Sequence, residues 1–143
     1  MSAAEDLSRQ ANRLPPSTPA SQAREHLLRE VNRRCIEISY LEDGWDGRGS
    51  KRPSKAVMLR AGELGLMIVG TTFPIPKTVN LGASADGFVQ FAIFGANGRE
   101  ADLWVEDDSG SFKYECSEGG KESSGNQLIS NYMRMAAWLS GDL

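Results

Sequence analysis

Histidine and cysteine are scarce in this sequence. It contains one histidine, His26, and two cysteines, Cys35 and Cys116. A structural zinc site needs four such ligands at short spacings, and a Ser-His-Asp triad needs a histidine oriented in a pocket by a carboxylate. His26 lies in a charged stretch typical of a solvated helix, and the cysteines fall on apolar faces, where reduced thiols pack as small hydrophobic groups. We therefore predict no catalytic residue, no cofactor and no metal site.

Long apolar runs and an excess of basic charge are also missing. No run approaches the ~20 apolar residues of a membrane span, and the polar segment Met1–Gln10 lacks the apolar stretch of a signal peptide. Lys and Arg together number 16 against 19 Asp and Glu, a net charge of -3. Nucleic-acid binding needs a basic face that displaces counterions. We expect a cytoplasmic protein that contacts neither membrane nor nucleic acid directly.

The length of 143 residues is typical of one domain, and a chain of this size buries a core without disulfides or metals. Residues 1–21 are rich in Ala, Ser, Pro and charge, which predicts a flexible N-terminal tail. Residues 22–143 are predicted to form a single α+β domain.

Apolar residues recur at helical spacing in three segments of this domain. The segments are residues 22–41 with Leu27, Val31, Cys35 and Ile38, residues 54–69 with Val57, Ala61, Leu64 and Ile68, and residues 126–139 with Leu128, Tyr132, Met135 and Leu139. Ser54 is a candidate N-cap for the second. We predict helices over these three ranges.

Between the second and third helices, four short runs alternate apolar and polar residues and are separated by Gly-containing turns. They span residues 78–81, 88–94, 100–106 and 111–116. The run 88–94 is apolar on both sides, which predicts partial cover on both faces, and residues 118–125 are read as a polar loop. The predicted fold is α+β: two N-terminal helices, a four-stranded antiparallel meander and a C-terminal helix packed on the sheet.

The segment Asp43–Arg52 is the first candidate site. Its glycines do not form a phosphate-binding loop, because Gly49-Ser50-Lys51 has the wrong order and follows a helix. The favoured interpretation is structural: Asp46 braces the turn through backbone amides, and Trp45 plugs the space between helices and sheet. The alternative is a ligand or catalytic site that uses Trp45, Asp46 and Arg48.

The residues from Leu41 to Ser54, which read Leu-Glu-Asp-Gly-Trp-Asp-Gly-Arg-Gly-Ser-Lys-Arg-Pro-Ser, resemble a motif of small bacterial and phage-borne proteins. Their pattern is Trp-Asp-Gly-x-Gly-Ala/Ser-x-x-Pro-Ser, followed by an amphipathic helix, a Pro-rich link and a short meander. The resemblance covers residues 41–116. It implies a fold of that kind but no activity, and the pattern's Trp near the end of the second strand is replaced here by Phe91 or Phe94.

Acidic residues gather in the segment Glu100–Asp108, which contains no Lys or Arg. The second candidate site consists of Asp102, Trp104, Glu106, Asp107 and Asp108. These carboxylates, with a tryptophan as anchor, suit a basic protein surface, and such a partner could itself bind nucleic acids. The competing interpretation, which we favour at this point, is a solvated strand edge whose charges discourage sheet-to-sheet aggregation.

The function that these observations favour is a non-enzymatic protein-interaction module that binds a basic partner surface. By analogy of size and charge, it could be an inhibitor from a prokaryotic mobile element, such as an anti-defence protein or an antitoxin. The alternative is a small ligand-binding domain or enzyme that uses the Asp43–Arg52 loop. A concave, partly polar cavity lined by that loop would favour the alternative.

Overall fold

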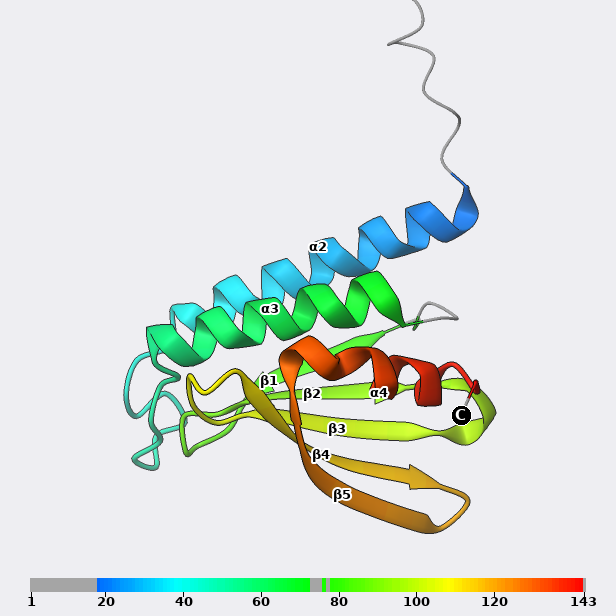
Figure 1. Cartoon of the computed structure of the whole chain (residues 1–143). Helices are drawn as coiled ribbons and strands as arrows, with labels where there is room; N and C mark the ends of the chain where they lie inside the picture. The colour runs from blue at the N-terminus through cyan, green and yellow to red at the C-terminus, as the bar shows by residue number, and fades with distance from the viewer. Residues whose placement is uncertain (1–17, 73–75, 77, 143) are drawn as a thin grey trace, which may run out of the picture.

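The computed structural model describes residues 18–72, 76 and 78–142, and within them three α-helices lie over one face of a five-stranded antiparallel sheet (Figure 1). The helices are α2 (Pro19–Ser39), α3 (Lys55–Thr71) and α4 (Tyr132–Leu139). The strands are β1 (Val79–Ala83), β2 (Val89–Phe94), β3 (Glu100–Val105), β4 (Ser111–Glu118) and β5 (Lys121–Leu128). The predicted α+β class is confirmed. Most of the predicted tail, residues 1–17, lies outside the described residues.

Two capped N-termini set the starts of the long helices. The Thr18 hydroxyl accepts a hydrogen bond from the Ser21 amide at 3.0 Å, and Pro19 stands in the first turn, where its missing N–H has no cost. Helix α2 therefore begins earlier than the predicted residue 22. The predicted cap of α3 is confirmed, because the Ser54 hydroxyl accepts from the Val57 amide at 3.1 Å.

The strands follow one another in the order β1-β2-β3-β4-β5, so every neighbouring pair is a hairpin. The alternation in β3 gives the predicted faces: Ala101, Leu103 and Val105 are buried toward the helices. The predicted partial cover of β2 matches its burial on both faces. Val89, Phe91 and Ile93 are buried toward the helices, and on the opposite face Gln90 and Ala92 are half-buried. No described helix packs on that opposite face, where Phe94 is exposed.

The fifth strand overturns part of the prediction at the C-terminus. Residues 118–125 are not a loop, because Gly119 and Gly120, with φ of 56° and 83°, form a tight turn that pairs Glu118 with Lys121. Strand β5 then runs to Leu128, so the predicted helix 126–139 is reduced to a 3₁₀ turn (Ile129–Asn131) and α4. The side chains of β5 are mostly exposed, and backbone pairing with β4 determines its conformation.

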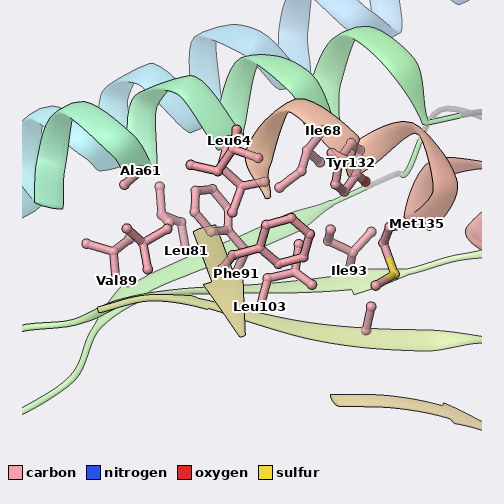
Figure 2. Close-up of a cluster of buried hydrophobic side chains, with 14 of the residues drawn as sticks. Ala61, Leu64, Ile68, Leu81, Val89, Phe91, Ile93, Leu103, Tyr132 and Met135 are labelled. Carbon is pink, nitrogen blue, oxygen red and sulfur yellow. The ribbon is translucent and has the colours of Figure 1, made fainter. Parts of the chain in front are cut away.

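The core lies between α3, α4 and the inner face of the sheet. Figure 2 shows Phe91 and Leu103 from the sheet beneath Leu64 and Ile68 of α3, with Tyr132 of α4 beside them. The Tyr132 hydroxyl shares a buried 2.6 Å hydrogen bond with Thr72, and burial raises the pKa of Tyr132 well above its usual value. A neutral, bonded phenol satisfies the single polar group of this side chain.

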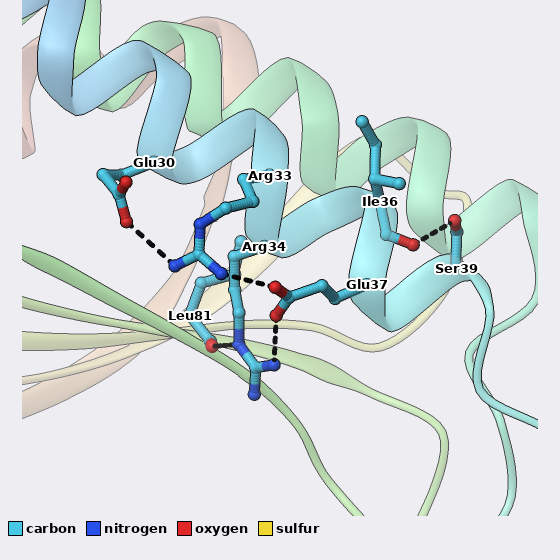
Figure 3. A network of polar contacts seen from close by, with 7 residues as sticks. All are labelled: Glu30, Arg33, Arg34, Ile36, Glu37, Ser39 and Leu81. Atoms are coloured by element: carbon cyan, nitrogen blue, oxygen red, sulfur yellow. Dashed lines mark hydrogen bonds and ion pairs between the residues drawn. The ribbon is translucent and has the colours of Figure 1, made fainter.

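Helix α2 is attached to the edge strand β1 through charged side chains (Figure 3). The Arg34 Nε atom donates to the Leu81 carbonyl at 2.9 Å, and Glu37 accepts from both Arg33 and Arg34. The hydrogen bond from Arg34 is the main reason that the pKa of Glu37 is lowered. The ion pairs of Glu37 lie within α2 and are solvent-exposed, so they add little stability. The buried Leu27, Val31 and Ile38 pack α2 onto the core, and the bond from Arg34 to Leu81 joins the helix to β1.

Candidate functional site

The Asp43–Arg52 loop is braced from within by its two carboxylates. One Asp46 oxygen accepts from the Arg48 amide at 2.8 Å and from the Ser50 amide at 3.3 Å, and the buried Ser50 hydroxyl accepts from the Asp46 amide at 3.2 Å. Asp43 accepts from the Arg52 amide at 3.0 Å. Hydrogen bonding, first with Ser50, lowers the pKa of Asp46. Asp46 thus plays the predicted bracing role.

Trp45 does not plug the space between helices and sheet, so that prediction is wrong. Its side chain is 37% exposed, and its indole N–H donates to the Lys51 carbonyl at 3.2 Å across the loop. A depression of about 840 Å³ lies beside the loop and is lined by Asp43, Lys51 and Arg52 among others. Trp45, Asp46 and Arg48 do not line it, and Asp43 is bound to a backbone amide. The loop therefore presents no pair of carboxylates to a ligand.

Trp45→Ala is expected to lower the free energy of unfolding by about 1–2 kcal/mol, below the ~3–5 kcal/mol of a fully buried tryptophan. Part of the indole already contacts solvent, and the hydrogen bond to Lys51 is lost. Asp46→Ala should also destabilise, because two backbone N–H groups lose their acceptor. Urea unfolding measures both, with the exposed Arg48→Ala as a neutral control. Wild-type stability in Asp46→Ala would contradict the bracing role.

The acidic segment lies on the central strand. Strand β3 is flanked by β2 and β4, so the interpretation of its charges as an edge guard is wrong. Asp102 and Trp104 point away from the helices, onto a face we call the outer face, made by the outward side chains of all five strands. No described helix packs on this face, so Trp104 does not lie under a helix.

Register brings Asp102 together with carboxylates that are distant in sequence. Asp102 pairs with Glu115, and Glu100 pairs with Ser117, which in turn pairs with Glu122. The result is a depression of about 450 Å³, the acidic groove, lined by Glu100, Asp102, Glu115, Cys116, Ser117, Glu122, Ser123 and Ser124. Among the described residues, none of its four carboxylates forms an ion pair with Lys or Arg. The groove thus has unpaired negative charge and small hydroxyl side chains.

A second depression, of about 500 Å³, adjoins the acidic groove and shares Glu115 and Ser124 with it. Three aromatic side chains line it: Phe88, Trp104 and Tyr114. Lys113 lies opposite Trp104 in the register and is paired with Glu106 at 3.0 Å. The outer face therefore combines a partly buried tryptophan with adjacent acidic charge.

The remaining residues of the second candidate site lie at the β3–β4 turn. Asp107 accepts from the Ser109 amide at 2.9 Å, and hydrogen bonds with Ser109 lower its pKa. The Asp108 carbonyl accepts from Arg60 at 3.2 Å, while its side chain is exposed. Asp107 touches the same small hollow as Trp104 and Glu106, and Asp108 lines none of these depressions. The five predicted residues are therefore only partly brought together.

Of the eight residues that line the groove, the predicted site included only Asp102. The seven that were missing are Glu100, Glu115, Cys116, Ser117, Glu122, Ser123 and Ser124. Glu115 was placed opposite Phe112, Tyr114 and Cys116, but without a register its neighbour on β3 was unknown. Glu122 and Ser124 were assigned to a loop. The turn Gly119-Gly120, between two stretches of equal length, was the signal that could have revealed them.

The described residues offer little reactive chemistry. No group of three or more His, Cys, Asp and Glu side chains among them could hold a metal ion. Cys116 is buried, with its sulfur 3.6 Å from that of Met135, and burial, together with the Asp102 charge, raises its pKa to about 11. Burial also raises the pKa of Cys35. Both thiols are therefore protonated at neutral pH and poor nucleophiles.

Comparisons with protein-family models, with curated proteins and with solved structures find no match to this chain. Within residues 18–72, 76 and 78–142, no helix is long and apolar enough to cross a membrane.

Proposed function

We propose that this protein is a non-enzymatic interaction module whose outer face binds a basic surface of a protein partner. The observation that carries the proposal is the acidic groove, which Glu100, Asp102, Glu115 and Glu122 line without an ion pair to any described Lys or Arg. Like charges held together repel one another, and a cationic partner removes that cost. Opposite charge also accelerates the encounter of the two proteins.

Trp104 supports the same proposal by adding an apolar anchor. Residues that dominate binding energy are often partly buried aromatics surrounded by polar groups that exclude water. Trp104 lies beside the acidic groove in a depression that also contains Phe88. A partner with Lys or Arg next to an apolar side chain would match both depressions.

A cytoplasmic inhibitor of the anti-defence or antitoxin type, encoded by a bacterial or phage mobile element, is the setting that we propose. Small size, acidic charge and the resemblance of Trp45-Asp46-Gly47 and its flanks to a phage-borne motif support it. The basic partner in such a setting could itself be a nucleic-acid-binding protein. The alternative is a ligand site or enzyme on the Asp43–Arg52 loop, and the depression that Asp43, Lys51 and Arg52 line supports it. Its support is weaker because Asp46 and Arg48 do not line that depression, and because Asp43 and Asp46 accept from backbone amides.

Neutralising the acidic groove is expected to weaken binding of a basic probe about tenfold at low salt, because several exposed charge pairs of modest strength are lost. The variant carries Glu100→Gln, Asp102→Asn, Glu115→Gln and Glu122→Gln together. The probe is fluorescent poly-L-lysine, followed by fluorescence anisotropy across a range of ionic strength. Binding by the wild type should weaken as salt rises, because screening shortens to ~3 Å at 1 M.

A matched control changes four exposed carboxylates away from the outer face: Glu25, Glu30, Glu42 and Asp142. It has the same net charge as the groove variant and should bind the probe as the wild type does. Equal loss in both variants would mean that only net charge matters, and the proposal would fail. Capture of partners from a host lysate, compared between these two variants, then identifies basic proteins that depend on the groove.

A further inference from the structure

Strand β5 is an open edge of the sheet. It pairs with β4 on one side, and no described strand or helix pairs with its other side (Figure 1). Its residues 123–128 contain no charge and no proline, and most of its side chains are exposed. Proteins usually protect such an edge with lysines, prolines or a covering element, because its unpaired N–H and C=O groups attract another strand. From Ser123 onward, this edge lacks those protections.

The alternation of hydrogen-bonded pairs between β4 and β5 shows which residues of β5 direct their backbone N–H and C=O groups toward the open edge. The Ile129 amide donates to the Gly110 carbonyl at 2.8 Å, so the pair 110–129 is a hydrogen-bonded pair. In an antiparallel ladder, hydrogen-bonded and non-hydrogen-bonded pairs alternate. Residues 121, 123, 125 and 127 therefore bond to β4, and the N–H and C=O groups of Glu122, Ser124 and Asn126 point to the open edge.

The side chains of these same residues lie on the outer face. Glu122 pairs with Ser117 and Ser124 pairs with Glu115, and both partners have their side chains on that face. Residues opposite one another in an antiparallel pair share a face. A residue that hydrogen-bonds to Ser124 from an added strand would thus place its side chain on the outer face. Strands lie about 4.8 Å apart, so a Lys or Arg there reaches Glu122 directly and Glu115 across small serines.

We propose that β5 accepts an extended segment of the basic partner as a sixth, antiparallel strand, in which Lys or Arg alternate with uncharged residues. The inference rests on the proposed function and specifies how the partner binds. The backbone groups of Glu122, Ser124 and Asn126 supply the hydrogen bonds, and the acidic groove selects the cationic side chains. In strand addition, main-chain bonds give affinity and alternate side chains give specificity.

Charge favours a basic segment over a second copy of this chain. Two copies that paired through β5 about a two-fold axis would join their outer faces on one side of a continuous sheet. That arrangement would place the acidic grooves of both copies on one surface and would add one lysine, Lys121, from each strand. A segment with a cationic side chain at every second position would instead neutralise the negative charge of the acidic groove.

The test uses three forms of one peptide, acetyl-Thr-Lys-Thr-Lys-Thr-Lys-Thr-amide, with the full-length protein and isothermal titration calorimetry. The first form is unmodified, the second is N-methylated at the lysines, and the third is N-methylated at the three threonines that each precede a lysine. In the proposed register, the lysine N–H groups face β5 and the threonine N–H groups face solvent. Methylated lysines should weaken binding at least tenfold, whereas methylated threonines should leave it within about threefold of the unmodified peptide.

Two variants of the protein provide the complementary measurement. Ser124→Pro and Ser124→Ala both remove the hydroxyl, but only proline also removes the outward N–H, which is the tolerated orientation for proline on an edge strand. Ser124→Pro should lose peptide binding and Ser124→Ala should keep it, with thermal melts confirming that both fold. If Ser124→Pro fails to fold, the methylated peptides alone decide.

Three results would overturn strand addition. They are equal binding of all three peptides, no binding of the unmodified peptide, and equal binding of a block-ordered peptide with the same composition. Salt-dependent binding of the block-ordered peptide that needs the acidic groove would leave the proposed function standing. A wild-type protein that is dimeric by sedimentation, and whose dimer competes with the peptide, would assign the edge to a second copy and overturn the proposal.

Discussion

Phe91→Ala is expected to lower the free energy of unfolding by about 3–5 kcal/mol, the range for truncating a buried phenylalanine. The Phe91 side chain is fully buried on β2, beneath α3, where its ring approaches Gly65 (Figure 2). Removing it leaves a cavity between the sheet and α3, since the helix cannot settle into the gap without moving from its other contacts. Urea unfolding followed by circular dichroism measures the change.

Phe94 provides a matched control on the same strand. It is the same residue type, but its side chain is on the outer face and 51% exposed. Phe94→Ala should cost less than about 1 kcal/mol, within the spread of strand propensities. Similar losses in the two variants would mean that the outer face is covered in solution, which would contradict an open binding face.

The faces of the central strands could be predicted because burial on one side produces an alternating pattern. Leu103 and Val105 alternate with Asp102 and Trp104, so the sequence separates the core side of β3 from the other side. The same pattern gives no information about what covers the second side. The apolar residues of β2 were therefore assigned partial cover on their second side, although the described helices all lie on the inner face.

Strand β5 could not be predicted from its side chains. Residues 121–127 are all polar, charged or glycine, so they show no alternation of apolar and polar side chains. Leu128 and Ile129 continue the apolar stripe of α4, and the predicted helix therefore began too early. The strand forms because each of its residues pairs with β4 across a glycine turn. Gly125 shows this dependence, since a Cβ there would lie 2.8 Å from the Tyr114 hydroxyl that crosses it.

The candidate site was predictable only where its residues are close in sequence. Asp102 and Trp104 share β3 and Glu106 directly follows it, so their common face follows from alternation. The acidic groove depends on register across β3, β4 and β5, which local patterns do not determine. The prediction that Trp45 fills the space between helices and sheet was wrong for a different reason. A tryptophan beside three glycines has few side chains to pack against, and its indole N–H instead donates a hydrogen bond within its own loop.

Trp104→Ala is expected to weaken binding of the basic partner by about 2 kcal/mol or more, a loss of about 30-fold, if Trp104 anchors the interface. The indole lies between Gln90 and Lys113 on neighbouring strands and borders the depression next to the acidic groove. A partner side chain that packs on the indole would be removed from water, while the neighbouring ion pair of Lys113 with Glu106 stays intact. Binding is measured by isothermal titration calorimetry. The partner used is the basic protein from the host lysate whose capture depends on the acidic groove.

The folded state should change much less than binding in this variant, because the other face of β3 retains Leu103 and Val105 in the core. Tyr40→Ala is the matched control, since Tyr40 is an aromatic residue that is 81% exposed at the end of α2, away from the outer face. It should bind the partner as the wild type does. Wild-type affinity in Trp104→Ala, with the groove variant still impaired, would leave electrostatic attraction as the basis of binding and remove the anchor. Loss of affinity in Tyr40→Ala instead would move the interface to the helical side of the protein.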